Sequence, residues 1–355
     1  MSNPTTRGKI FACLIAGGLG DALGYEVEFS SWPAIQDRFG RDGIRELSLH
    51  SGKARISDDT QMTLFTAEGL VLGSRQGESN TMSASIYQAY LCWLQTQGYP
   101  AKSIWASESR LLENPDMNRT RAPGNTCLSA LYSGKMGTPE KPINHSKGCG
   151  GVMRTAPCGM VRRRGGVHPF GAPLLLGAKA AAITHGHPMG WVPAGMLADI
   201  VDRCLYENYA SLRELIEASL RETVKTFAPC EGIEAFEAMM RRAMDLAARP
   251  HCEGIETASV DEPAIRSLGG GWVGDEALAI AAYAALRYEG DLKEALIAAV
   301  NHGGDSDSTG AICGNILGAW LGPDAVDPAW VEKLELAEEI KAVADALQRI
   351  MDCES

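Results

Sequence analysis

Two short acidic segments carry the residue types best suited to chemistry in this chain. Residues 57–60 read Ser-Asp-Asp-Thr and residues 305–309 read Asp-Ser-Asp-Ser-Thr, so each segment combines two carboxylates with hydroxyls. Adjacent carboxylates repel one another unless a positive charge neutralises them, and a hard divalent cation with oxygen ligands usually does so. No His or Cys stands within either segment, which disfavours zinc. The pair predicts the two halves of one Mg²⁺ or Mn²⁺ site.

Together the two segments offer enough oxygen atoms for two cations. We expect the metal ligands to be Ser57, Asp58, Asp59, Asp305, Asp307 and Ser308. Two divalent ions held about 3.5–4 Å apart are typical of two-metal hydrolytic sites. Each segment alone has a simpler interpretation, because Ser57 or Asp58 could cap one helix. Asp305 or Asp307 could likewise cap a second helix, so the metal prediction depends on the same pattern occurring twice.

Two glycine-rich segments differ in what they indicate. Residues 147–154, Lys-Gly-Cys-Gly-Gly-Val-Met-Arg, are not a Walker A motif, because no Gly-Lys-Ser or Gly-Lys-Thr follows. Such a loop lets backbone amides approach a phosphate, although a tight turn explains it equally well. Residues 17–24 miss the dinucleotide-binding fingerprint, because Leu23 stands at the third glycine position. We interpret them as a helix whose small residues allow close packing.

Two histidines follow a predicted helix within residues 184–188, Thr-His-Gly-His-Pro. Histidines two residues apart could bind a metal, but a histidine at a helix C-terminus more often interacts with the last carbonyls. We favour this structural role for His187 and leave the role of His185 open. Asn301 and His302 precede the second acidic segment, and we expect them to position its turn.

Composition excludes several classes of partner. The 355 residues carry a net charge of −11 and a pI near 5.2, which argues against nucleic acid or an anionic membrane as the main partner. A small phosphorylated ligand held by backbone amides remains compatible with this charge. Hydrophobic residues at 45% and charged residues at 22% are typical of a globular protein.

The cysteines and the apolar segments predict a cytoplasmic protein. Ten cysteines occur without a Cys-x-x-Cys pair, so neither a zinc ribbon nor a thioredoxin-type motif is encoded. Free thiols are typical of a reducing compartment. The polar first residues do not form a signal peptide, and no apolar run is long enough to span a bilayer.

The elements that must position these residues are predicted to be helices. Apolar residues recur at helical spacing while alternating β-branched runs hardly occur, and Leu336, Ile340, Val343, Leu347 and Ile350 form one stripe. Helices are predicted over 7–17, 60–72, 81–96, 173–185, 189–205, 211–227, 275–286, 291–300 and 308–320. Loops are predicted over 112–126, 133–151, 163–173 and 249–273, with Gly303 and Gly304 as a helix C-cap and turn. We expect an all-α fold, a compact orthogonal multi-helix bundle forming a single domain over residues 1–355.

Six segments, in order along nearly the whole chain, resemble the motifs of the ADP-ribosylglycohydrolase family, of the dinitrogenase-reductase-activating glycohydrolase and ADP-ribosyl-acceptor hydrolase type. They are residues 20–24 followed by Glu28, then 57–62, 121–126, 147–154, 184–188 and 303–308. The resemblance implies an all-α fold with a dinuclear metal cleft built from loops and helix ends. It also implies ADP-ribose, or an ADP-ribosylated protein, as the binding partner.

The resemblance assigns roles by position. The six ligands named above would hold two cations, Mg²⁺ or Mn²⁺, and Asp59 or Glu28 would be the catalytic base. Residues that would bind the substrate are Gly124, Gly148, Cys149, Gly150, Gly151, Val152, Met153 and His185. Cys149 stands where several relatives carry asparagine. The aromatic residue that would stack on adenine is Tyr132, Trp191 or Trp272.

The activity implied is hydrolysis of the bond at C1 of the distal ribose, by a metal-activated water, with an arginine-linked acceptor favoured. Two other interpretations stay open. The first is a non-catalytic ADP-ribose-binding or structural protein on the same fold. The second is a Mg²⁺-dependent phosphohydrolase of the haloacid-dehalogenase type, suggested by Asp305-x-Asp307, which requires that motif to follow a strand.

Overall fold

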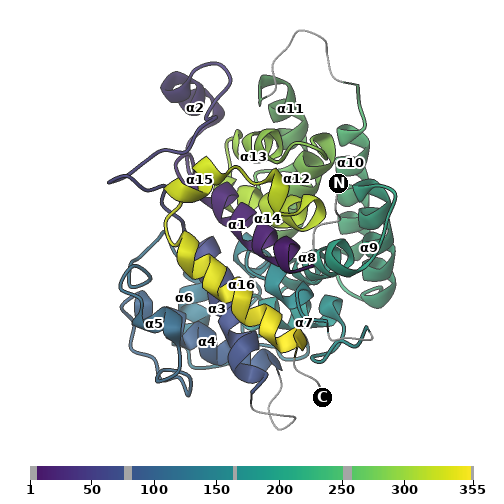
Figure 1. Cartoon of the computed structure of the whole chain (residues 1–355). Helices are drawn as coiled ribbons and strands as arrows, with labels where there is room; N and C mark the ends of the chain where they lie inside the picture. Colours follow the sequence, from purple (N-terminus) through teal and green to yellow (C-terminus); the bar gives the residue numbers. More distant parts are fainter. Residues whose placement is uncertain (1–5, 76–81, 163–165, 251–257, 353–355) are drawn as a thin grey trace.

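A computed structural model of the chain describes residues 6–75, 82–162, 166–250 and 258–352, and within these ranges the architecture is helical (Figure 1). The α-helices are α1 (Thr6–Gly24), α2 (Trp32–Phe39), α3 (Asp58–Gly73), α4 (Met82–Thr96), α5 (Arg110–Glu113), α6 (Asn125–Tyr132), α7 (Pro173–Ala182), α8 (Pro188–Tyr206), α9 (Leu212–Thr226), α10 (Ile233–Ala247), α11 (Ala258–Leu268), α12 (Gly274–Arg287), α13 (Leu292–Val300), α14 (Ser306–Leu321), α15 (Pro328–Lys333) and α16 (Ala337–Asp352). Short 3-10 helices are η2 (Cys149–Gly151), η3 (Ala156–Gly159) and η4 (Pro323–Ala325). The described β pairing is limited to three isolated bridges, so the all-α prediction is confirmed. The single domain stays a prediction.

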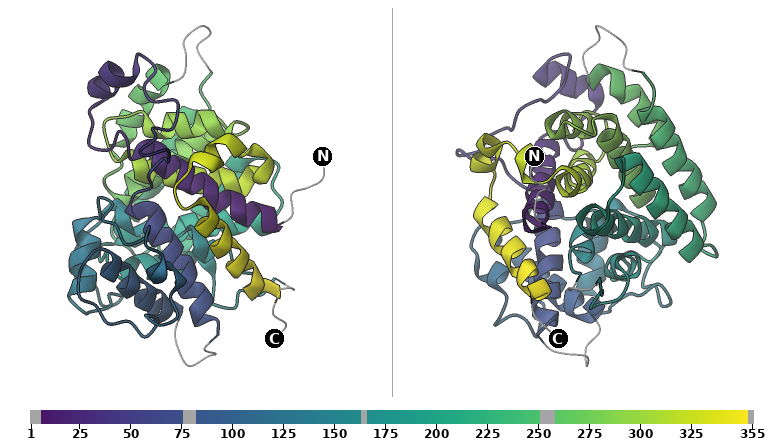
Figure 2. Two further views of the ribbon diagram at one scale, coloured as in Figure 1. Left: turned by 60° about the vertical axis from the view of Figure 1, so that its left-hand side comes forward. Right: turned by 45° about the vertical axis from the view of Figure 1, so that its right-hand side comes forward.

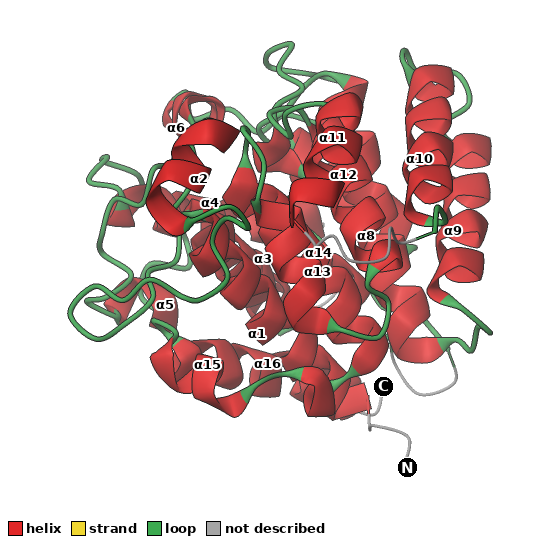
Figure 3. Cartoon of the chain, turned by 90° about the horizontal axis from the view of Figure 1, so that it is seen from above, coloured by secondary structure: helices red, strands yellow, loops and turns green. Residues whose placement is uncertain are grey.

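The centre of the fold is the antiparallel pair α1 and α14, which lie beside each other in Figures 1 and 3. Small residues let their backbones touch. A Cβ atom on Gly20 would lie 2.1 Å from the carbonyl oxygen of Gly310, and one on Gly24 would lie 2.2 Å from that of Ser306. Close packing through small residues was predicted for residues 17–24. The contact brings the C-terminal end of α1 against the N-terminal end of α14, where the second acidic segment begins.

Both acidic segments open helices. Ser57 is the N-cap of α3, where its Oγ accepts from the amide of Asp59 at 3.2 Å. Asp305 is the N-cap of α14, and its side chain accepts from the amide of Ser308 at 3.3 Å. Every residue of α3 is buried, so the first acidic segment enters the interior with its helix. Helix N-termini favour negative charge, which lowers the cost of placing carboxylates there.

Several sequence predictions fail where long-range packing decides the backbone. Helix α11 lies inside the predicted loop 249–273, of which residues 251–257 are outside the described ranges, and α10 was not predicted. Gly303 and Gly304 do not form the C-cap of α13, because that cap is Asn301 and neither glycine has a positive φ. Gly304 instead permits a close approach, since a Cβ atom there would lie 1.9 Å from the carbonyl oxygen of Gly270.

The remaining helices enclose the central pair. Helices α9 and α10 lie side by side at one edge of the molecule (Figure 2), and α16 packs across α1 and α3. Four members of the predicted C-terminal stripe are buried on α16, namely Ile340, Val343, Leu347 and Ile350. The fifth, Leu336, lies just before the helix with a φ of +59° and is only partly buried, so the stripe is shorter than predicted. None of the described helices is both long and apolar enough to cross a membrane. The cytoplasmic location stays a prediction.

Candidate functional site

The structure brings the two acidic segments together around Asp307. Its side chain lies near those of Ser57, Glu28 and Asp305 and interacts with each of them electrostatically, and these residues come from three separate parts of the chain. Asp58, Asp59, Asp305 and Asp307 are each no more than 5% exposed, and Ser57 and Ser308 are buried beside them. We call Glu28 and these six residues the acidic centre. All seven were selected from the sequence.

The electrostatics of the acidic centre require a positive partner or protons. Burial, and then the charge of Asp307, raises the pKa of Asp58 and of Asp59 well above the usual range of a carboxyl group. Burial followed by the charges of Asp307 and Asp305 raises the pKa of Glu28 to about 10. Several carboxylates therefore share one small volume without enough compensating charge.

The donor set fits a hard divalent cation. Two buried carboxylate oxygens, Oε2 of Glu28 and Oδ1 of Asp59, have no hydrogen-bond partner in the protein. Buried carboxylate oxygens are costly unless a hydrogen bond or a metal satisfies them. Carboxylate and hydroxyl oxygens are the ligands that Mg²⁺, Mn²⁺ and Ca²⁺ prefer. The acidic centre therefore has both the ligand chemistry and the unmet capacity of a cation site.

Asp21 positions the first acidic segment, a role that sequence reasoning missed. It is fully buried on α1 and accepts from the amides of Ser57 at 2.9 Å and Thr60 at 3.0 Å, as well as from the Thr60 hydroxyl. Burial, and then the charge of Asp307, raises the pKa of Asp21 to about 7. The sequence does contain a signal for this role. Asp21 is the one acidic residue of α1, and a buried carboxylate needs a partner.

The loop over residues 121–124 holds Asp58 from outside the helix. The amide of Asp58 donates to the carbonyl of Arg121 at 2.9 Å, and the amide of Gly124 donates to Oδ2 of Asp58 at 3.3 Å. A Cβ atom added to Gly124 would have no atom within 4 Å, so this position borders open space. Gly124, predicted to bind substrate, therefore lies at the edge of the acidic centre.

The glycine-rich loop contacts the second acidic segment. The thiol of Cys149 donates to Oδ2 of Asp305 at 2.8 Å, and Oγ of Ser308 contacts Sδ of Met153 at 3.8 Å. Val152 and Met153 are buried, and their amides donate to the carbonyl of Cys149, at 2.8 and 3.2 Å. The amides of Val152 and Met153 are therefore already paired within the loop, and the substrate role of both residues stays a prediction.

A hydrogen-bonded relay fixes the proton of His185. Arg154, fully buried, donates through Nη2 to Oγ1 of Thr184 at 2.6 Å, and that oxygen lies 2.8 Å from Nδ1 of His185. A guanidinium only donates, so Oγ1 of Thr184 accepts from Arg154, and we assign the hydroxyl hydrogen of Thr184 to Nδ1 of His185. Burial, and then the charge of Arg154, lowers the pKa of His185 to about 3, so the ring is neutral. With Thr184 as the donor to Nδ1, the proton of the ring is assigned to Nε2.

This Nε2–H faces the glycine-rich loop. A Cβ atom on Gly148 would lie 3.3 Å from Nε2 of His185, and one on Gly150 would lie 3.5 Å from it. His185 is thus a neutral hydrogen-bond donor pointed toward the loop predicted to hold the substrate. Arg154 and Thr184 were quoted in the matching segments, but neither was assigned a role, because spacing along the chain does not show which side chains meet.

Comparison with known proteins agrees with this geometry. The chain matches the family described as ADP-ribosylglycohydrolase over residues 2–354. The chain belongs to the ADP-ribosylglycohydrolase family. It is 25% identical over 357 residues to the ADP-ribosyl-[dinitrogen reductase] glycohydrolase of Rhodospirillum rubrum, covering 98% of both chains. It is 28% identical over 189 residues to human ADP-ribosylhydrolase ARH3, covering 48% of this chain and 50% of that protein.

A solved structure supports the fold. The chain aligns with an ADP-ribosylglycohydrolase-related protein complex at a TM-score of 0.59 and 23% identity, covering 98% of this chain and 99% of that one. The resemblance inferred from six sequence segments is therefore confirmed. Membership supports an ADP-ribosyl glycohydrolase activity, and the acidic centre is the part of this family member that could carry it.

His187 differs from the predicted role. It caps the start of α8 rather than the end of α7, because its Nδ1 accepts from the amide of Met189 at 3.0 Å. With His145 and Glu231 it forms a group whose possible ligand atoms all lie within 4.8 Å of one another. A neutral ring whose Nδ1 accepts must carry its proton on Nε2, so metal binding through Nε2 would break the cap. The acidic centre is the stronger metal candidate.

The three aromatic residues considered for adenine have different surroundings. Trp191 is 5% exposed and packs edge-on against Phe227, with ring centroids 5.4 Å apart, so it belongs to the core. Tyr132 is 60% exposed beside Tyr99, and Trp272 is 43% exposed and stacks on Phe29. Only the last two could meet a ligand without repacking the interior.

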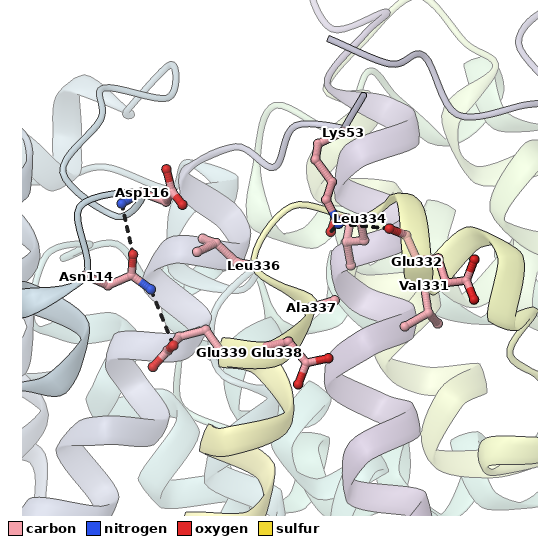
Figure 4. A pocket seen from close by; sticks show the side chains of 10 residues that line it. All are labelled: Lys53, Asn114, Asp116, Val331, Glu332, Leu334, Leu336, Ala337, Glu338 and Glu339. Carbon is pink, nitrogen blue, oxygen red and sulfur yellow. Dashed lines mark hydrogen bonds between the residues drawn. The ribbon is translucent and has the colours of Figure 1, made fainter. Parts of the chain in front are cut away.

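A separate pocket of about 470 Å³ lies where α15 leads into α16 (Figure 4). Its polar side chains already bond to neighbouring groups, since Nδ2 of Asn114 donates to Glu339 at 3.3 Å and Nζ of Lys53 donates to the carbonyl of Glu332 at 2.8 Å. No residue of the acidic centre lines this pocket. The pocket is therefore separate from the acidic centre.

Proposed function

We propose that the protein removes ADP-ribose from a modified protein by hydrolysing the bond at C1 of the distal ribose, with an arginine-linked acceptor favoured. The observation that carries the proposal is the buried acidic centre, closed from both ends of the chain, with two unpartnered carboxylate oxygens. The relative from Rhodospirillum rubrum is named for action on ADP-ribosyl-dinitrogen reductase, which supports a protein acceptor.

The six predicted ligands of the acidic centre would hold two divalent cations, Mg²⁺ or Mn²⁺. When bound, such ions supply positive charge that lowers the pKa of a water molecule and orients the ribose hydroxyls. The protein fixes this geometry through Asp21, which bonds to the turn that carries Ser57 and Thr60. Holding the reacting carbon in one position removes much of the entropic barrier to attack.

Two carboxylates are candidates for the base that takes a proton from the attacking water. Asp59 is fixed in the first turn of α3, whereas Glu28 lies on the segment that follows α1, and each has one oxygen without a hydrogen-bond partner. Proton transfer by a positioned carboxylate contributes typically 10²–10⁴-fold. Nearby carboxylates also stabilise the positive charge that develops on the ribose ring.

His185 and the glycine-rich loop would bind the ADP-ribose. The protonated Nε2 of His185 would donate to an oxygen of the ribose or the diphosphate, because it faces Gly148 and Gly150. Gly124 would contact the ligand beside Asp58, at the edge of the acidic centre. These contacts support recognition of ADP-ribose, whichever acceptor is attached.

The structure argues against the phosphohydrolase alternative, which requires the Asp305-x-Asp307 motif to follow a strand. Asp305 caps a helix and follows a loop, and no strand precedes it within the described residues 258–304. A non-catalytic binder on the same fold remains a second candidate, because it would use the same loop contacts.

One assay separates these candidates. The protein is incubated with ADP-ribosylated arginine and with a generic phosphate ester, each with and without Mn²⁺. Mn²⁺-dependent release of ADP-ribose supports the proposal. ADP-ribose binding without release would point to the non-catalytic protein, and phosphate release alone would contradict the proposed function.

A further inference from the structure

The glycine-rich loop places a sulfur atom at the second acidic segment. Neither acidic segment contains a cysteine, and on that ground the sequence disfavours zinc. In the folded protein, however, the thiol of Cys149 donates to Oδ2 of Asp305 at 2.8 Å. Cys149 is partly exposed, so its sulfur is accessible to a cation. The fold therefore adds a soft ligand atom to a site whose other ligand atoms are hard oxygens.

This thiol lies near carboxylates of both acidic segments. Burial is the largest cause that raises the pKa of the Cys149 thiol, and the charges of Asp305 and then of Asp59 add to it. Asp59 is 3% exposed, and its Oδ1 has no hydrogen-bond partner within the described residues. A buried carboxylate oxygen of this kind is costly unless a metal or a donor satisfies it. The sulfur therefore adjoins an oxygen with unmet capacity to bind a cation.

The backbone of the loop holds the sulfur in position. The amide of Cys149 donates to the carbonyl of Trp272 at 3.2 Å, and its own carbonyl accepts from the amide of Val152 at 2.8 Å. A Cβ atom on Gly151 would lie 2.2 Å from the carbonyl oxygen of Gly190, so the loop packs directly against α8. A ligand side chain on a backbone fixed in this way is organised before the cation arrives.

The hydrogen bond from Cys149 competes with metal binding for one oxygen. Oδ1 of Asp305 accepts from the amide of Ser308 at 3.3 Å, so Oδ2 is the oxygen better placed to meet a cation. A sulfur and an oxygen bound to one Zn²⁺, at about 2.3 and 2.0 Å, lie about 3.5 Å apart at a tetrahedral angle. The present separation of 2.8 Å need therefore increase by only about 0.7 Å.

We propose that Cys149 binds one of the cations of the acidic centre as a thiolate, together with Asp305, and that this position therefore prefers Zn²⁺ to Mg²⁺ or Mn²⁺. The inference rests on the cation-binding part of the proposed function, but not on hydrolysis. On binding, the bond between sulfur and hydrogen breaks, a bond between sulfur and the metal forms, and the proton leaves to solvent. Thiolate ligands select softer cations, and Zn²⁺ binds most sites more tightly than Mn²⁺ does.

The competing interpretation is that the thiol only positions Asp305 by its hydrogen bond. A thiol is a weak, neutral donor, so it would leave the repulsion between the carboxylates uncompensated. Both interpretations predict that Cys149→Ser changes activity. The test therefore needs a direct readout of the bond between sulfur and metal.

Co²⁺ provides that readout, because a thiolate bound to it gives a charge-transfer absorption band in the near ultraviolet that oxygen ligands do not give. The band should appear when Co²⁺ is added to the wild type and should be absent in Cys149→Ser, whose folding is checked by circular dichroism. Cys230→Ser is the matched control. Cys230 is also partly exposed, and it precedes Glu231 of the group formed with His145 and His187. This variant should keep the band.

Three outcomes would overturn the inference. A band lost in Cys230→Ser but kept in Cys149→Ser would place the thiolate-bound cation at the histidine group. A wild type that binds Mn²⁺ but shows no band with Co²⁺ would exclude the thiolate and leave the proposed function intact. A wild type that binds neither cation would contradict the inference and the metal part of the proposed function together.

Competition with a chelator then measures the preference between cations. Zn²⁺ affinity should fall more than about 100-fold in Cys149→Ser, because even the loss of an outer-shell partner costs about 10- to 100-fold. Mn²⁺ affinity should fall about tenfold or less, because the hydroxyl of serine remains a suitable hard ligand or donor. Equal losses for both cations would make Cys149 a positioning residue for Asp305 and would contradict the preference for zinc.

Discussion

Two groups of residues that could ligate a metal differ in the hydrogen bonds that the rest of the structure makes to them. In the acidic centre, Asp59 and Glu28 each have a buried oxygen that bonds to nothing in the protein. In the second group, His145, His187 and Glu231, the possible ligand atoms all lie within 4.8 Å of one another. Yet Nδ1 of His187 already holds the start of α8.

The difference shows that proximity alone does not identify a metal centre. A cation bound at the acidic centre would satisfy oxygens that now carry a free-energy cost, and it would relieve repulsion between carboxylates. A cation bound through His187 would instead require the loss of a helix cap. Unmet hydrogen-bonding capacity within a cluster of carboxylates is therefore a better guide to a candidate metal site than proximity alone.

The largest expected effect comes from Asp305→Ala. Loss of this carboxylate should reduce turnover about a thousandfold or more, because a catalytic metal supplies several kcal/mol of transition-state stabilisation. Mn²⁺ affinity, measured by calorimetry, should fall while the helical circular dichroism spectrum is kept. Retention of full activity would contradict a site made from both segments.

Asp327→Ala is the matched control. Asp327 also caps a helix, α15, where its side chain accepts from the amide of Ala329 at 2.8 Å. Loss of that cap should cost about 1 kcal/mol of stability and leave turnover unchanged. The contrast separates the metal role of Asp305 from its capping role.

Removal of the metal should make stability depend on pH. Folding raises the pKa of Asp21 to about 7 and that of Glu28 to about 10, and it raises those of Asp58, Asp59 and Asp307. A carboxyl group whose pKa is raised by folding contributes its full stability when the pH is below its pKa in the unfolded chain, near 4. This stability is lost as the pH rises through its pKa in the folded protein.

The metal-free protein should therefore melt at a lower temperature at about pH 8 than at about pH 5. Excess Mn²⁺ should reduce this difference, because the cation replaces the missing positive charge. Calorimetric scans with and without chelator test this, and Asp58→Asn should flatten the metal-free dependence. Identical melting temperatures at both pH values without metal would argue against repulsion in the acidic centre.

Breaking the relay to His185 should have a smaller effect, and this effect should fall on substrate binding. Thr184→Val removes the hydroxyl that joins Arg154 to Nδ1 of His185, so the proton is no longer fixed on Nε2. We expect KM to rise about tenfold, in line with the loss of one hydrogen bond of about 1–1.5 kcal/mol. Thr184→Ser, which keeps the hydroxyl, should remain close to the wild type.

Nitrogen-15 NMR of the imidazole provides a readout that a purely structural role would not change. In the wild type, His185 should be the neutral tautomer with hydrogen on Nε2, and Thr184→Val should shift it toward a mixture. A wild-type ring protonated on Nδ1 would refute the relay.

The sequence was sufficient where short patterns decide the structure. The acid and hydroxyl grouping at Ser57 and at Asp305 identified two helix starts that do meet, and apolar spacing identified α3, α8 and α16. The sequence was not sufficient to predict contacts between segments that lie far apart along the chain. Nothing local shows that Asp21 bonds to the turn at Thr60, or that Gly304 must be small because Gly270 lies against it.

The smallest expected effect is that of His187→Ala, which completes the comparison of the two groups. Loss of its cap on α8 should lower the free energy of unfolding by about 1 kcal/mol in urea titrations. His187→Asn should retain most of the stability, because an asparagine side chain also caps helices well but cannot replace an imidazole as a transition-metal ligand. Turnover and Mn²⁺ binding should be unchanged in both variants. A His187→Asn protein that is stable yet loses Mn²⁺-dependent activity would show that the histidine group, and not only the acidic centre, binds a functional metal.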